Sequence, residues 1–131
     1  MATNSRSLVG VATVLTKGST SSDNFFPMTA WQAVAGVAGV RAAVDMRGNA
    51  GDCKISPAYQ TCNDPDSPDT PVGIGTAWQT GDGITYPAGF TTLTGSIEDK
   101  QWIRFGVFAK NVATATITGC QARIKVDVQG P

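Results

Sequence analysis

The chain has 131 residues, with ten basic and ten acidic side chains and no histidine. The zero net charge argues against nucleic-acid and membrane-surface partners, because both attract proteins with a basic excess. The absence of histidine removes the commonest general base and the commonest metal ligand. The length is typical of one domain, which we expect to span residues 1–131.

Two stretches in the first third of the chain read as strands. Residues 8–15 are apolar and rich in β-branched side chains. Residues 40–47 place small and apolar side chains at every second position, as a half-buried strand does. Between them, Phe25-Phe26-Pro27-Met28 is expected at a strand edge or as a plug over one end of the fold, since proline cannot donate to a ladder.

Residues 29–40 permit a short helix or a loop. Gly36 and Gly39 each disfavour a helix by about 1 kcal/mol relative to alanine. We therefore expect a loop or an irregular strand that leads into the strand at residues 40–47.

The middle of the chain alternates strand and turn signals. Residues 54–61 are expected to form an edge strand because they contain Pro57. Residues 63–71 hold three prolines and three aspartates, which predicts a long exposed loop. Residues 72–79 and 84–93 are weaker strand candidates.

The last third contains the clearest strand pattern. In residues 122–129 four apolar side chains alternate with polar ones, which gives one apolar face and one wet face. The strand at residues 102–109 is apolar on both faces, because Trp102 and Phe108 point away from Ile103 and Phe105. A covering loop, a protein contact and a carbohydrate-stacking platform all remain explanations for that second face.

These elements predict an all-β fold. We expect a single β-sandwich or jelly roll of about seven or eight mostly antiparallel strands with long loops and few helices.

Three cysteines, Cys53, Cys62 and Cys120, do not suggest a disulfide framework, because the count is odd and the N-terminus has no signal-peptide pattern. If residues 54–61 are extended, Cys53 and Cys62 lie about 30 Å apart and cannot pair. If the segment folds back, they can. We expect buried free thiols in a chain made in the cytosol.

No catalytic motif is present, and we expect neither enzymatic activity nor a cofactor. Asp82, Glu98 and Asp99 could in principle act as a glycosidase pair, but they fit solvated turn residues better.

Two ligand sites deserve mention as weaker hypotheses. Asp64, Asp66 and Asp69 could offer oxygen ligands to Ca²⁺, although the loop lacks the glycine and glutamate of an EF-hand, so an ordinary acidic loop is favoured. Trp31, Trp78 and Tyr59 could form a sugar-stacking face.

Two segments resemble small β-sandwich proteins of tailed-phage virions, such as head decoration or accessory proteins. They are Lys100-Gln101-Trp102-Ile103-Arg104-Phe105-Gly106-Val107 and Arg123-Ile124-Lys125-Val126-Asp127-Val128. The resemblance implies a non-enzymatic virion subunit, made in the host cytoplasm, that contacts copies of itself or a major capsid protein. The apolar side chains expected at such an interface are Trp102, Phe108, Phe25 and Phe26. The alternative is a carbohydrate- or ligand-binding β-sandwich module, with or without Ca²⁺.

Overall fold

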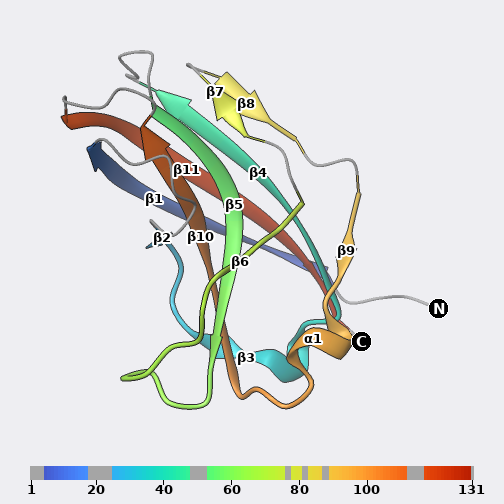
Figure 1. Ribbon diagram of the computed structural model, residues 1–131. Helices are drawn as coiled ribbons and strands as arrows, with labels where there is room; N and C mark the ends of the chain where they lie inside the picture. The colour runs from blue at the N-terminus through green and yellow to red at the C-terminus, as the bar shows by residue number, and fades with distance from the viewer. Residues whose placement is uncertain are drawn as a thin grey trace.

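The computed structural model describes residues 5–17, 25–47, 53–75, 78–80, 83–86, 89–111 and 117–130. Two antiparallel sheets form two layers (Figure 1). The five-stranded sheet has the order β1 (Ser5–Lys17), β11 (Ile117–Gln129), β4 (Gly39–Arg47) and β8 (Gly83–Thr85), and β9 (Thr91–Thr92) also pairs with β4. The predicted all-β sandwich is therefore confirmed.

The six-stranded sheet is built around two long central strands. Its order is β2 (Phe25–Pro27), β10 (Trp102–Asn111), β5 (Cys53–Cys62) and β6 (Val72–Gly73). In addition, β3 (Gln32–Ala33) pairs with β10 and β7 (Gln79–Thr80) pairs with β5. The described strands are more numerous than the seven or eight predicted, because the weak candidates at 72–79 and 84–93 form separate two- and three-residue pieces. The long strands β1, β5, β10 and β11 extend beyond their predicted bounds.

The alternating sequences fold as their pattern predicts. Val44 on β4 lies opposite Ile124 on β11, and both side chains are buried. On β10, Ile103 and Phe105 face the same interior from the other sheet. Every second residue of these strands is apolar, so each sheet has one face that is removed from water by the opposite layer.

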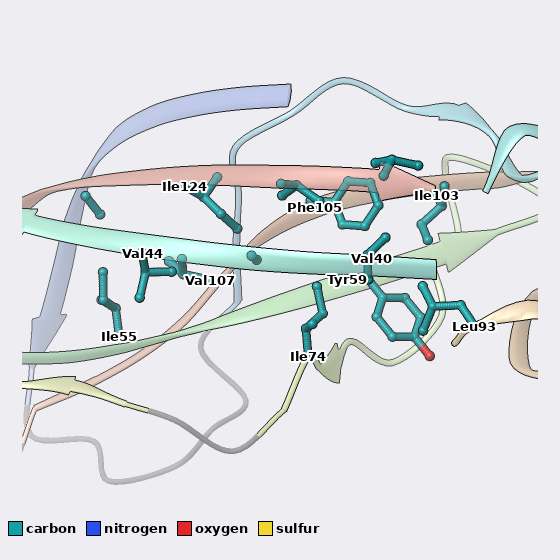
Figure 2. Packing of buried hydrophobic residues seen from close by; sticks show 14 of the residues in the cluster. Val40, Val44, Ile55, Tyr59, Ile74, Leu93, Ile103, Phe105, Val107 and Ile124 are labelled. Carbon is teal, nitrogen blue, oxygen red and sulfur yellow. The ribbon is translucent and has the colours of Figure 1, made fainter. Parts of the chain in front are cut away.

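The core lies between the two sheets, as Figure 2 shows for fourteen of its side chains. Phe105 is its largest fully buried side chain. Two buried side chains, Leu93 and Ile97, close one end of the core. Leu93 comes directly before the one-turn helix α1 (Thr94–Ile97), and Ile97 is the last residue of that helix. Tyr59 reaches toward this end, where a side-chain hydrogen bond joins the Tyr59 hydroxyl to Ser96.

The prediction that residues 54–61 form an edge strand is wrong. β5 is an interior strand, with β10 along one side and β6 and β7 along the other. Pro57 lies opposite Val107 of β10, but its carbonyl faces the side of β6 and β7, and its nitrogen must face the same side. On that side Pro57 lies between the short ladders that β6 and β7 form, so its missing N–H removes no bond to β10. The Pro57 carbonyl accepts a bond from the Ile74 N–H, 2.9 Å away.

The strand edge predicted around Phe25 is present as β2, and the alternative of a plug is not what the structure shows. This edge requires two glycines, one from each sheet. A Cβ at Gly106 would collide with the Phe26 carbonyl oxygen, and a Cβ at Gly10 would collide with that of Met28. The backbone between Phe26 and Met28 therefore approaches β10 and β1 this closely only because both positions lack a side chain.

Two remaining connections have the irregular structure that the sequence predicts. Residues 29–40 form β3 and a short 3₁₀ turn, Val34–Gly36, rather than an α-helix. Residues 63–71 contain neither helix nor strand. None of the helices in the described part of the chain has the length and apolar character needed to cross a membrane.

Cys53 and Cys62 begin and end β5, so the extended reading of this segment holds and the two cysteines cannot bridge to each other. Cys62 is a buried free thiol.

Candidate interaction surface

The outer face of the six-stranded sheet is the candidate site. Because Ile103 and Phe105 point into the core, the alternate residues of β10 point outward, and their partners on β5 do the same. The outward pairs are Trp102 with Cys62, Arg104 with Gln60, Gly106 with Ala58, and Phe108 with Ser56. We call the part formed by Trp31, Gln60, Trp102 and Arg104 the Trp102 surface.

Arg104 contacts two other members of the Trp102 surface, Trp31 and Gln60. Its guanidinium carbon lies 4.3 Å from the centre of the Trp31 ring. Its Nε and Nη2 donate to Gln60 Oε1 at 2.9 and 2.7 Å. Burial lowers the pKa of this guanidinium, but arginine remains charged at any physiological pH. A cation is thus held over an aromatic ring.

A chain of polar contacts holds Gln60, the residue that binds the Arg104 guanidinium. Gln60 Nε2 donates to the Asp69 carbonyl oxygen at 2.9 Å, which sets the orientation of the Gln60 amide. The Asp69 carboxylate accepts from Thr61 Oγ1 at 2.9 Å and pairs with Lys100 Nζ at 2.9 Å. The Lys100 contact first, and then the Thr61 hydroxyl, lower the pKa of Asp69. The 63–71 loop is therefore anchored to the Trp102 surface.

Trp102 itself remains accessible, with 38% of its surface exposed. Phe108 lies farther along β10 and Phe25 lies opposite it on β2, with ring centres 6.1 Å apart in an edge-to-face arrangement. Both are half-buried, and Gly73 lies beside the Phe108 ring. The structure thus places these three predicted interface residues on the same outer face.

Phe26 does not belong to this surface. It lies opposite Val107, whose side chain points inward, and it packs against the core. Consecutive residues of a strand face opposite sides, so Phe25 and Phe26 cannot serve the same interface.

The three aspartates considered for Ca²⁺ do not converge. Asp64 Oδ1 accepts the Asp66 N–H at 3.0 Å, while Asp69 is engaged by Thr61 and Lys100. Within the residues that the structure describes, no three acidic, cysteine or histidine side chains gather as a metal site would require. Asp64, Asp66 and Asp69 therefore do not form a Ca²⁺ site in this structure.

The sugar-stacking trio is not assembled either. Tyr59 is buried in the core on the inner face of β5. Arg104 covers one face of the Trp31 ring. Trp31, Trp78 and Tyr59 thus do not form one open platform, and Trp102 is the exposed aromatic side chain of this surface.

Sequence reasoning missed the stacking of Arg104 on Trp31 and the role of Gln60. A partial signal was present, because Arg104 is two residues from Trp102 and must share its face. Trp31 lies on a connection whose position the pattern does not predict.

Comparison of the chain with models of known protein families finds no match, and comparison with curated protein sequences finds none either.

Proposed function

We propose that the protein is a non-enzymatic structural subunit that acts through protein–protein contacts made by the Trp102 surface. The observation that carries this proposal is the arginine held against Trp31 beside the exposed Trp102. Tryptophan and arginine are the residues most enriched among those that dominate binding energy at interfaces. The Gln60 contacts hold Arg104 in place before binding, so less side-chain entropy is lost in the complex.

The polar groups around this surface support a binding role over catalysis. Gln60 accepts from Arg104 and donates to the Asp69 carbonyl oxygen, and the Asp69 carboxylate accepts from Thr61 and pairs with Lys100. Polar side chains that bond to one another in this way fix the conformation of a surface, whereas a general base must reach a substrate proton. The sequence also offers no histidine for such a role.

The class of assembly that we propose is the tailed-phage virion, with the chain as a decoration or accessory subunit on the capsid. The resemblance of the β10 and β11 segments to such proteins supports this proposal. The low share of charged residues, 15%, also suits a surface that packs against a larger body. In this proposal the Trp102 surface contacts a capsid protein.

Co-sedimentation tests the proposal. Particles from cultures that produce the chain are separated on a density gradient and probed with an antibody against it. The wild-type chain should sediment with capsid-sized particles, and the Trp102→Ala chain should stay at the top of the gradient. Val72→Ala is the matched control, since Val72 is also an exposed apolar residue of this sheet but lies on β6.

Two outcomes would contradict the proposal. A wild-type chain that never sediments with particles removes the virion assignment. Retention of the wild-type chain on immobilised glycans, lost in Trp102→Ala, would instead support the carbohydrate-binding alternative.

A further inference from the structure

The outer face of the five-stranded sheet carries a second, different surface. On β4 and β11 the outward pairs are Arg41 with Asp127, Ala43 with Lys125, Asp45 with Arg123, and Arg47 with Gln121. The alternate residues of both strands are buried, which leaves these side chains on the outside. We call this surface the cationic face.

The two carboxylates of the cationic face are already paired. Asp127 Oδ2 lies 2.9 Å from Arg41 Nε. Asp45 lies 3.1 Å from Arg47 Nε and 3.5 Å from Arg123 Nη2. Four cationic side chains thus share two anionic ones, and an excess of positive charge remains around Lys125.

Apolar side chains border these charges. Tyr86 is 70% exposed and Val9, opposite Lys125, is 61% exposed. The Arg41 guanidinium carbon lies 4.6 Å from the centre of the Phe90 ring. Two adjoining hollows, of about 250 and 490 Å³, share Arg41, Lys125 and Asp127 in their linings. A cationic surface with exposed aromatic side chains is suited to bind an acidic protein segment.

The chain itself has such a segment, made of the loop at residues 63–71 and the residues that follow α1. Apart from Asp45 and Asp127, every carboxylate whose side chain the structure describes lies in the 63–71 loop or at residues 98–99, which we call the acidic end. Its members are Asp64, Asp66, Asp69, Glu98 and Asp99. The loop lies at the lower left of Figure 1 and α1 at the lower right.

The acidic end is tied together rather than spread over separate loops. The Gln101 N–H donates to Asn63 Oδ1 at 2.9 Å, and Asn63 Nδ2 donates to the Asp99 carbonyl oxygen at 3.4 Å. Lys100 is engaged by Asp69. The carboxylates of Asp66, Glu98 and Asp99 therefore project from one connected unit with a negative excess.

We propose that the acidic end of one copy docks on the cationic face of a second copy. The charge complementarity of the two surfaces selects this partner. Contact of the cationic face with another cationic face would bring like charges together, which is unfavourable. Since the two surfaces differ, the contact is head-to-tail, and each added copy leaves one surface of each kind available for the next.

Light scattering at two salt concentrations tests this contact. At about 0.05 M NaCl the mass of the wild-type protein should rise with protein concentration. At about 0.5 M NaCl it should return to that of the monomer, because the screening length falls about threefold. A wild-type chain that stays monomeric at low salt over the full concentration range would overturn the proposal.

Two variants, each with one surface altered, make the test specific. The face variant carries Lys125→Glu and Tyr86→Ser, and the end variant carries Asp66→Lys and Glu98→Lys. All four positions are exposed, and thermal melting checks that both variants fold. If a double variant does not fold, the single changes Lys125→Glu and Asp66→Lys replace it.

Each variant alone should remain monomeric at low salt. Their equimolar mixture should form a 1:1 dimer and stop there, because the intact acidic end of the face variant can dock only on the intact face of the end variant. A mixture that stays monomeric, or a variant that associates like the wild-type protein, would contradict the head-to-tail contact. Trp102→Ala should still self-associate, so this test can fail independently of the capsid assignment.

Discussion

The guanidinium of Arg104 lies over the ring of Trp31, 4.3 Å from its centre, and both of its bonds to Gln60 end on the same oxygen. This arrangement joins β10, β5 and the connection before β3 on the outer face of one sheet. A cation against an aromatic ring contributes roughly 0.5–2 kcal/mol, depending on how far it is removed from water. The contact therefore shapes the surface and also stabilises the fold.

The first prediction concerns this contact. Arg104→Lys should lower the free energy of unfolding by about 1–2 kcal/mol, because lysine keeps the charge but lacks the planar group that stacks and donates twice. Urea unfolding followed by tryptophan fluorescence measures the change. Arg123→Lys on the cationic face is the control and should change stability by less than about 0.5 kcal/mol. Equal effects of the two substitutions would show that the stack contributes nothing.

The second prediction concerns the close approach of β2 to β10. Gly106→Ala should destabilise the fold by about 2–3 kcal/mol, because the new Cβ would collide with the Phe26 backbone and force the two strands apart. Gly95→Ala, where a Cβ would meet no atom within 4 Å, should be neutral or slightly stabilising. Thermal melting of both variants tests this difference, and a tolerated Gly106→Ala would mean that β2 lies farther from β10.

The third prediction is a dependence of stability on pH. The Ser7 hydroxyl first, and then Arg41, lower the pKa of the Asp127 carboxyl. A carboxyl with a lowered folded-state pKa stabilises the fold above its unfolded value of about 4, and this contribution is lost as the pH falls through the folded-state pKa. Asp127→Asn should therefore melt earlier than the wild-type protein at neutral pH.

The difference in melting temperature between Asp127→Asn and the wild-type protein should shrink as the pH is lowered below about 4. The wild-type protein itself should keep some pH dependence from Asp69, whose pKa is lowered in the same direction. A melting difference that stays constant down to strongly acidic pH would contradict the role given to Asp127.

The fourth prediction concerns the thiol of Cys62. Burial, and next the nearby Asp69 carboxylate, raise the pKa of this thiol. Because the thiolate is the reactive form, Cys62 should resist iodoacetamide at about pH 8 in the folded protein and react fully in guanidinium chloride. Peptide mass mapping separates Cys62 from Cys53 and Cys120. Rapid modification of Cys62 in the folded state would show that its side chain reaches solvent.

Local pattern was sufficient to predict the long strands. The alternation in residues 40–47 and 122–129 assigns each side chain to one face, and the structure buries the apolar set, as with Val44 and Ile124. The loop at residues 63–71 was predictable for a similar reason, since proline and aspartate restrict their own backbone whatever lies around them. The outward direction of Trp102 and Arg104 also follows from alternation alone.

Pairing between distant residues was decided only in the tertiary structure. Ser5 lies opposite Gln129, and β5 becomes an interior strand because β6 and β7 form short ladders on either side of Pro57. The stack of Arg104 on Trp31 depends on where an irregular connection crosses the sheet. Alternation determines which face a side chain occupies, but strand order and contacts across the sheet depend on interactions between residues far apart in the chain, which no local pattern records.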